Sequence, residues 1–355
     1  MLFSISALLF SRVVVSSLIA TLVALSPAGA GEHDGLEGKT IRAIIGSSAG
    51  GTTDTTSRAF YDRLEKTLPE TTIRVQNIDG SGGAKALKEM QGAEGSVITL
   101  ASFGYGPIYR QLLSPDISAF DLTQVHWIGA LTRVQRVLAM RPGLGGTTLA
   151  ALRSLGRQPV SATADALSSS TIDTLLLNAM LELQMRVIPG TSDAQQAAML
   201  LSGDIDLVLG DRFEFDPQFK SGQLIPVLRL STTTEAETLA GVPAIADLVS
   251  TKVPQELVFL LETLGKSGHL IAAAPSTDPA IVEALRESFE KVAHDPTFAD
   301  EMAKRGIAIA STPGDELTDR LEEVLGASSA TLQAALQSYL ACGKRMSDEG
   351  ATSCD

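Results

Sequence analysis

The sequence has few cysteines, few basic residues and no recognisable metal-binding motif. Only two cysteines occur in 355 residues, and Lys and Arg number 28 against 41 Asp and Glu. The resulting net charge of −13 argues against nucleic-acid binding, which needs a basic surface. The four histidines show no metal-ligand spacing, and no HExxH, CxxC or EF-hand pattern is present. We therefore expect neither a bound metal nor a cofactor.

Long apolar runs are missing after the first 30 residues, so we expect no membrane-spanning helix in the rest of the chain. Near the start, Val13–Leu25 is an apolar run, and Ala28-Gly-Ala30 follows it as a small-residue cleavage pattern. This pattern predicts a signal peptide over residues 1–30 and an exported protein. A retained membrane anchor is the alternative, although a spanning helix prefers about 20 apolar residues.

The two cysteines, Cys342 and Cys354, both lie near the C-terminus. In an oxidising compartment they could close a short loop as a disulfide. The alternative is a pair of free thiols on the tail.

Strand-like apolar runs alternate with helix-compatible segments from residue 40 onward, which predicts an α/β fold with mostly parallel sheets. The expected strands are Ile41–Ile45, Thr72–Gln76, Val97–Ala101, Val134–Met140, Val160–Ala162, Met185–Ile188, Ile205–Leu209, Ile225–Leu230, Leu257–Leu261, Leu270–Ala274 and Ile307–Ala310.

No linker rich in Pro, Ser or charge interrupts the chain, as expected for two lobes joined by strands that cross between them. We expect lobe 1 to comprise residues 31–133 plus 268–325, and lobe 2 to comprise residues 134–267. Residues 326–355 are expected to form a C-terminal helix and a tail that contains the cysteines.

Two glycine-rich turns follow the first two expected strands. Ser47–Asp54 reads Ser-Ser-Ala-Gly-Gly-Thr-Thr-Asp, and Asn77–Gly83 reads Asn-Ile-Asp-Gly-Ser-Gly-Gly. Unsatisfied N–H groups at a helix start favour an anion, and glycine lets a ligand approach the main chain closely. Because ligands gather at the carboxyl ends of parallel strands, the two turns predict a shared anion-binding edge. A purely structural role for each turn is the alternative.

These turns do not indicate a nucleotide site, because neither contains G-x-G-x-x-G or the Gly-Lys-Ser/Thr ending of a P-loop. Gly46–Gly50 does match G-x-S-x-G, the nucleophile elbow of α/β-hydrolases. A serine hydrolase would use Ser48, with Asp211 and either His269 or His294 as partners. The elbow normally follows a central strand rather than the first one, so we keep hydrolysis as an alternative and do not expect an enzyme.

Three turns in the second half also follow strands and precede helices. Ser168–Ser170 supplies several hydroxyl groups at a helix start, which either cap the helix or bind a ligand. Gly190 and Thr191 belong to the next such turn. Asp211 follows a buried strand, and it is either a cleft residue or a solvated loop acid.

Taken in order, several segments resemble the substrate-binding receptors of tripartite tricarboxylate transporters, also called Bug or TctC receptors. The likeness spans about residues 38–325. The matching segments are Gly38–Gly46 with Ala49–Asp54, Asn77 with Gly80–Gly83, Phe120–Leu122, Trp127–Ala130, Leu200–Asp206, Gly222–Leu224, Leu239–Leu248 and Ala274–Val282.

The resemblance implies a two-lobed periplasmic binding protein of type II-like fold. Such a receptor closes on a small organic carboxylate and delivers it to integral-membrane permease subunits, and we expect it to be a monomer. Main-chain groups of the first two turns would hold the carboxylate. The implied ligand-binding residues are Ser48, Ala49, Gly50, Gly51, Thr52, Thr53, Gly82, Gly83, Ser168, Ser169, Ser170, Gly190, Thr191 and Asp211.

The chain departs from the family pattern at two places that bear on function. Asp79 stands where an Arg is common, which would alter the charge preference for ligands. The tail after about Gly326 has no family counterpart. These departures keep open a third hypothesis, a receptor-like sensor or scaffold that no longer transports.

Overall fold

The computed structural model describes residues 35–94, 96–114, 119–231, 237–265, 267–326 and 329–354. These residues belong to one compact unit, His33–Asp355. The predicted signal peptide, residues 1–30, lies outside the described residues. None of the described helices is long and apolar enough to cross a membrane.

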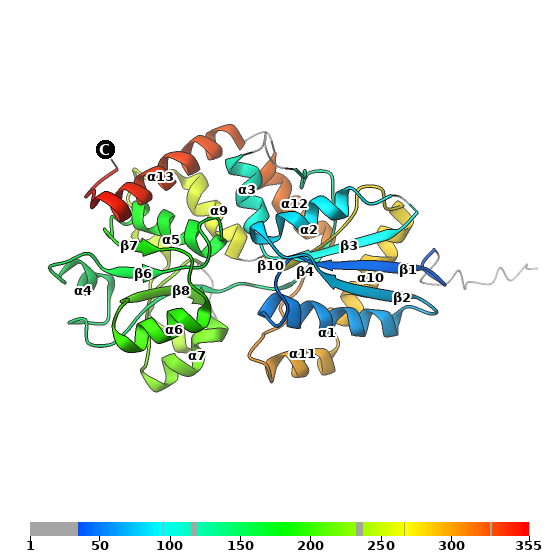
Figure 1. Cartoon of the computed structure of the whole chain (residues 1–355), viewed down its shortest axis with the longest axis horizontal. Helices are drawn as coiled ribbons and strands as arrows, with labels where there is room; N and C mark the ends of the chain where they lie inside the picture. Colours follow the sequence, from blue (N-terminus) through cyan, green and yellow to red (C-terminus); the bar gives the residue numbers. More distant parts are fainter. Residues whose placement is uncertain are drawn as a thin grey trace, which may run out of the picture. The chain divides into compact units, whose positions relative to one another are not determined.

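Within these residues the first sheet, here sheet A, has six strands in the order β11-β4-β10-β3-β1-β2 (Figure 1). Strands β1, β2 and β3 are mutually parallel, and β10 runs antiparallel between β3 and β4. Four strands therefore point the same way, as the α/β prediction requires. The strands are β1 Thr40–Ile45, β2 Thr72–Asn77, β3 Ile98–Phe103, β4 His126–Thr132, β10 Gly268–Ala273 and β11 Thr312–Pro313.

The second sheet, here sheet B, has five strands in the order β7-β6-β8-β5-β9 within the described part of the chain. Its strand β5 runs antiparallel to both neighbours, whereas β6 is parallel to β7 and β8. Both sheets thus contain one strand reversed between parallel ones. The strands are β5 Arg136–Met140, β6 Val160–Ala162, β7 Arg186–Ile188, β8 Leu207–Asp211 and β9 Ile225–Arg229.

Helices cover both faces of sheet A, because its buried strands carry apolar side chains on each side. In β1, Ile41, Ala43 and Ile45 belong to one core cluster with side chains of α1, α10 and α11, while Ile44 belongs to another with α2, α3 and α12. These helices are α1 Thr52–Thr67, α2 Ala84–Gln91, α3 Gly106–Leu113, α10 Pro279–Ala293, α11 Pro296–Ala303 and α12 Gly314–Leu325.

The hydrophobic core continues from sheet A into sheet B. The cluster that contains Ile44 also includes Leu138 of β5 and apolar residues of α5, α9 and α13. A separate small cluster packs the other face of sheet B against α6 and α7. The remaining helices are α4 Leu149–Arg153, α5 Ser169–Met180, α6 Asp193–Ser202, α7 Arg212–Ser221, α8 Ile245–Leu248, α9 Gln255–Gly265 and α13 Ser329–Glu349.

The C-terminal helix α13 packs on α5 and also touches α3, α9 and β7 (Figure 1). The amide of Asn178 in α5 donates to the carbonyl of Gly343 at 3.2 Å, and the amide N–H of Val187 in β7 donates to the Ser347 hydroxyl at 3.0 Å. A disulfide joins Cys342 to Cys354, with their Cα atoms 5.3 Å apart. The helix and the chain end are thus fastened beside sheet B.

Two expected strands are wrong. Leu257–Leu261 lies within helix α9, where the buried positions 257, 260, 261 and 264 follow helical spacing. Ile307–Ala310 forms no strand, and only Thr312–Pro313 just after it pairs with β4. The strand β4, absent from the expected set, lies directly before the predicted crossing into the second half.

The contact of α13 with α5 generates a stability prediction at Gly343. A Cβ there would lie 2.1 Å from the backbone oxygen of Leu175, so Gly343→Ala must push the two helices apart. We expect a loss of about 2 kcal/mol in the free energy of unfolding. Helix propensity alone predicts the opposite, a gain of about 1 kcal/mol. Urea unfolding decides between the two expectations. The control is Ala341→Ser, which also adds one heavy atom to α13 but at an exposed position. A Gly343→Ala variant that is more stable than the wild type would contradict the packing argument.

Two aspartates that cap helices generate a pH prediction. Asp211 caps α7 by accepting the Phe213 N–H, and Asp278 caps α10 by accepting the Ala280 N–H. Burial, and to a smaller extent the charge of Glu214, raises the pKa of Asp211 to about 6. Between about pH 4 and pH 6 the folded state therefore binds more protons than the unfolded state, so this group lowers stability as the pH rises.

Asp211→Asn keeps a good N-cap and removes this titration. We expect the free energy of unfolding of the variant to equal that of the wild type near pH 4 and to exceed it by about 2 kcal/mol at pH 7. Urea unfolding at both pH values measures this difference. The exposed cap variant Asp278→Asn is the matched control and should show no such pH-dependent difference. An Asp211→Asn difference in stability that is the same at both pH values would show that this half-buried carboxyl group does not titrate in this range.

Candidate ligand-binding cleft

A cleft of about 1040 Å³ opens where the loops of sheet A face those of sheet B. On one side it is lined by the turns that follow β1, β2 and β3, which include Ser48, Gly82 and Gly104. On the other side it is lined by the loop after β6, by α6 and by α7. The carboxyl ends of parallel strands therefore supply much of the cleft wall, as the sequence predicted for sheet A.

The turn after β1 is organised by Asp54, whose side chain is buried. Its carboxylate accepts the Gly50 N–H at 2.9 Å, the Asn77 side-chain amide at 2.8 Å and the Arg58 guanidinium at 2.8 Å. Burial alone would raise the pKa of Asp54, but these hydrogen bonds hold the pKa below its ordinary value. The Gly50 amide is thus used internally, whereas no side-chain hydrogen bond caps the start of α1 at Gly51.

Close contacts between glycines join the three turns of sheet A. A Cβ on Gly46 would lie 3.0 Å from the Cα of Gly83, and a Cβ on Gly106 would lie 3.2 Å from the Gly82 carbonyl. Gly82 and Gly83 also have φ angles of 62° and 100°, which favour glycine. Side chains at Gly46 and Gly106 would therefore push the turns apart, and glycine at these positions leaves the main chain of this wall accessible.

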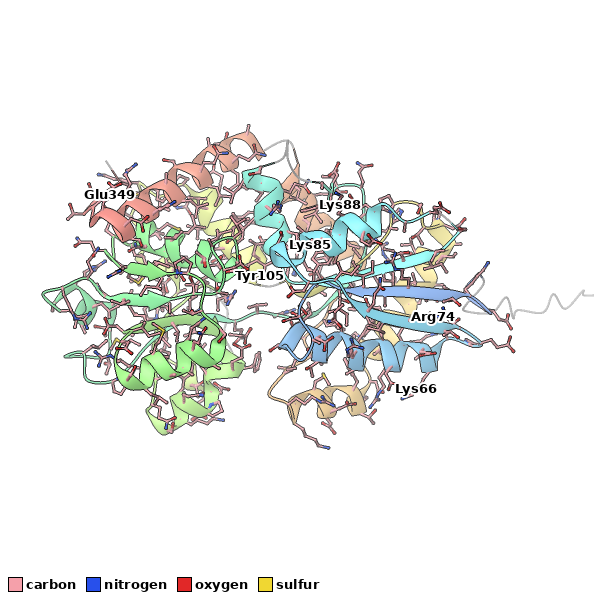
Figure 2. All side chains as sticks on the ribbon, in the orientation of Figure 1. Lys66, Arg74, Lys85, Lys88, Tyr105 and Glu349 are labelled. Carbon is pink, nitrogen blue, oxygen red and sulfur yellow. A yellow bond between two sulfur atoms is a disulfide. The ribbon has the colours of Figure 1, made fainter. Side chains whose placement is uncertain are left out.

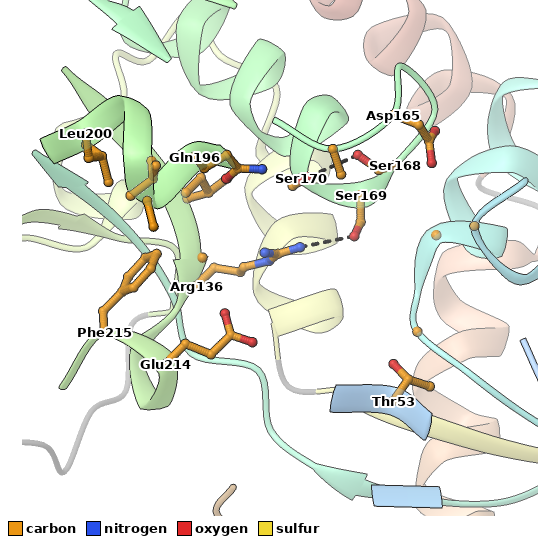
Figure 3. A pocket seen from close by; sticks show the side chains of 18 of the residues that line it. Thr53, Arg136, Asp165, Ser168, Ser169, Ser170, Gln196, Leu200, Glu214 and Phe215 are labelled. Carbon is orange, nitrogen blue, oxygen red and sulfur yellow. Dashed lines mark hydrogen bonds between the residues drawn. The ribbon is translucent and has the colours of Figure 1, made fainter. Parts of the chain in front are cut away.

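On the side of sheet B, serine hydroxyls lie at the start of α5. The Ser168 hydroxyl accepts the Thr171 N–H at 3.3 Å and so caps the helix, and it lies 3.0 Å from the Ser170 hydroxyl. The Ser169 hydroxyl instead accepts a hydrogen bond of 3.1 Å from Nη2 of Arg136 (Figure 3). The serines therefore combine capping with a polar surface on the cleft.

Arg136 is the first residue of β5, and its side chain is only 13% exposed. Because β5 is reversed, this end of the strand lies beside the carboxyl end of β8, where Arg136 pairs in register with Asp211. Nε donates to the Tyr105 hydroxyl at 2.8 Å and lies 3.6 Å from an oxygen of Asp173. A basic residue in a predicted strand is the sequence signal for this position, and Arg136 was not among the expected site residues.

A buried polar network surrounds Arg136 and joins the two sheets. Asp173 of α5 accepts hydroxyl hydrogen bonds of 2.5 Å from both Tyr105 and Tyr109 on the side of sheet A. Figure 2 shows Tyr105 at the junction between the two halves. Burial raises the pKa of Asp173, and Arg136 opposes that rise. Burial also lowers the pKa of Arg136, but Tyr105 and Asp173 outweigh it and raise the pKa, so the guanidinium stays charged.

The residues that the resemblance implied divide into two groups. The cleft wall includes Ser48, Thr53, Gly82, Ser168, Ser169 and Ser170. Outside that wall lie Ala49, Gly50, Gly51, Thr52, Gly83, Gly190, Thr191 and Asp211.

Local hydrogen bonds account for several members of the second group. The Thr191 hydroxyl donates to the Thr163 carbonyl, the Gly190 N–H donates to the Ala164 carbonyl, and Asp211 caps α7. These contacts order the loops that border the cleft.

The geometry does not assemble the hydrolase alternative. Nδ1 of His269 lies 2.7 Å from the Thr132 hydroxyl, and Nδ1 of His294 lies 3.0 Å from the Glu290 carbonyl. Burial lowers the pKa of His269 to about 4. Among the described residues neither histidine is hydrogen-bonded to Ser48, so the base that a serine nucleophile needs is not in place.

Sequence comparison identifies relatives across most of the chain. No model of a known protein family matches the sequence. A Cupriavidus necator protein described as "UPF0065 protein in gbd 5'region" is 27% identical over 303 residues, which cover 83% of this chain and 86% of that protein.

Solved structures share the fold. A TctC solute-binding protein from Polaromonas, without ligand, has a TM-score of 0.63 at 18% identity and covers 84% of this chain and 98% of its own. An R. palustris protein with adipate has a TM-score of 0.59 at 18% identity and covers 87% of this chain and 96% of its own. MatC from Rhodopseudomonas palustris, with bound malate, has a TM-score of 0.56 at 17% identity and covers 87% of this chain and 99% of its own. The chain thus has the fold of TctC solute-binding proteins and is a relative of UPF0065 proteins, which confirms the resemblance inferred from the sequence.

Proposed function

We propose that this chain is an exported solute-binding protein that captures a small organic carboxylate between two lobes. The observation that carries the proposal is the cleft itself, with main-chain turns on one wall and a buried, charged Arg136 with serine hydroxyls on the other. A fixed cation and hydrogen-bond donors that converge on one cleft suit an anion. The ligands printed for two structures of the same fold, adipate and malate, are carboxylates, and this supports the choice of ligand class.

Binding by closure follows from the way the chain crosses between the sheets. Strand β4 of sheet A ends at Thr132 and strand β5 of sheet B begins at Arg136. The chain returns between α9, which ends at Gly265, and β10, which begins at Gly268. Short crossings of this kind suit hinges, and a ligand that touches both walls favours the closed state. In this proposal lobe 1 comprises residues 31–133 plus 268–325 and lobe 2 comprises residues 134–267. The protein holds its ligand without chemical change, so it is not an enzyme.

The proposal extends to the path of the ligand. A signal peptide cleaved near Ala30 would bring the protein to the periplasm, and integral-membrane permease subunits of a tripartite tricarboxylate transporter would accept the loaded receptor. The receptor would act as a monomer. This extension rests on the family resemblance.

A thermal-shift screen of the exported protein against mono-, di- and tricarboxylates and amino acids tests the proposal. A ligand that binds only the folded state raises the melting temperature with increasing concentration. A dose-dependent shift with an organic acid, reproduced by calorimetric titration, supports a carboxylate receptor. A folded protein without co-purified ligand that responds to no acid would contradict it and would favour the sensor or scaffold hypothesis.

Gly104 gives a variant that should block the cleft without strain. It lines the cleft, a Cβ there meets no atom within 4 Å, and its φ lies outside the left-handed region. We therefore expect Gly104→Leu to fold and to weaken binding of the ligand found in the screen by about 100-fold or more, which is about 3 kcal/mol. The control is Gly92→Leu at an exposed position outside the cleft wall. Unchanged affinity in a folded Gly104→Leu would show that the ligand binds elsewhere.

A further inference from the structure

The described wall of the cleft carries more acidic than basic side chains. Two arginines, Arg136 and Arg141, lie in its wall among the described residues. Arg141 contacts Asp206 at 3.0 Å, and this buried carboxylate also holds Arg157 at 2.6 Å. Arg141 thus donates directly to a structural carboxylate. Arg136 lies 3.6 Å from Asp173 but donates its hydrogen bonds to hydroxyl groups, so it is the cation of the wall that is better placed to meet a ligand.

One side of the Arg136 guanidinium remains available for a ligand. Nε donates to the Tyr105 hydroxyl and Nη2 donates to the Ser169 hydroxyl. Within the described part of the chain Nη1 has no hydrogen-bond partner, and Arg136 lines the cleft. The bonds to Tyr105 and Ser169 fix the plane of the guanidinium, so a carboxylate that enters the cleft finds a preorganised donor.

Three acids line the same cleft. Asp79 follows β2, Asp165 follows β6 and Glu214 lies in α7, and all three are exposed. Figure 3 shows Asp165 and Glu214 on opposite sides of Arg136. With one available cation and three acids, a first carboxylate on the ligand is attracted to Arg136. A second carboxylate would find no further available cation among the described residues of the cleft wall and would be repelled by the acids.

Apolar side chains also line the cleft on the side of sheet B, beside the amides of Gln196, Gln218 and Gln223. Leu200 of α6 and Phe215 of α7 are half-buried and face the cleft, with Leu209 and Leu224 buried behind them. Figure 3 places Leu200 and Phe215 on the side of Arg136 opposite to Ser169. An apolar ligand body that covers these side chains would be stabilised by removal of apolar surface from water.

We propose that the ligand is a monocarboxylate with an apolar body, its carboxylate on Arg136 and its body against Leu200 and Phe215. This inference rests on the proposed function and narrows it, because it assigns a ligand with one carboxylate rather than two or three. Arg136 is then the residue that selects for the anion, and the acids reject polycarboxylates.

Matched acids of equal chain length test the inference. Butyrate and succinate, hexanoate and adipate, and octanoate and suberate differ within each pair by one carboxylate. We expect calorimetric titration of the exported protein to give at least about 10-fold tighter binding of the monocarboxylate in the pairs that bind, with the longer pairs favoured. Equal or tighter binding of the diacid would overturn the inference and leave the carboxylate receptor intact.

If none of the six acids binds, the inference is overturned, and the broader acid screen decides separately whether the receptor proposal stands. A di- or tricarboxylate identified as the ligand in the broader screen would also overturn the inference and leave the carboxylate receptor intact. The two failures are therefore distinguishable.

Two variants identify the groups responsible. We expect Arg136→Gln to weaken hexanoate binding by about 30-fold, because one charge-assisted hydrogen bond is lost. Glu214→Gln, a substitution at an exposed position, should reduce the ratio of the hexanoate affinity to the adipate affinity. Circular dichroism checks that each variant folds. A folded Arg136→Gln with unchanged hexanoate affinity, or an unchanged preference in Glu214→Gln, would contradict the assigned roles.

Discussion

The cleft depends on the burial of one positive charge, that of Arg136. A guanidinium removed from water is costly unless charged and polar groups surround it. Here Asp173 supplies the opposite charge, and Tyr105 and Tyr109 satisfy the oxygens of that carboxylate. Because the tyrosines belong to the side of sheet A and Asp173 belongs to α5, the groups that satisfy this charge also join the two halves, beside the hydrophobic core that continues between the sheets.

Local signals in the sequence predicted much of the fold. Alternating apolar runs and glycine turns identified β1, β2 and the loops after them. Such signals depend on a few neighbouring residues, so they can be read from the sequence. The strand Leu257–Leu261 failed because a short apolar run fits a buried strand and a buried helix equally well.

The part of the site that could not be predicted arises from long-range pairing. The role of Arg136 follows from the reversal of β5 between β8 and β9, and strand direction is not encoded in the residues of the strand itself. The same holds for Asp54, the last residue of the first glycine-rich turn. It becomes an internal acceptor only when Asn77, from the next strand, is brought beside it.

The fastening of α13 has a consequence for how the protein should be produced. Helix α5 presents its serines to the cleft at one end, while Asn178 near its other end is tied to Gly343, next to the disulfide-bonded Cys342. The cleft wall and the oxidised C-terminus therefore share one supporting helix. Protein expressed in a reducing cytoplasm lacks this covalent tie, so its serine wall is less firmly supported than that of the oxidised protein.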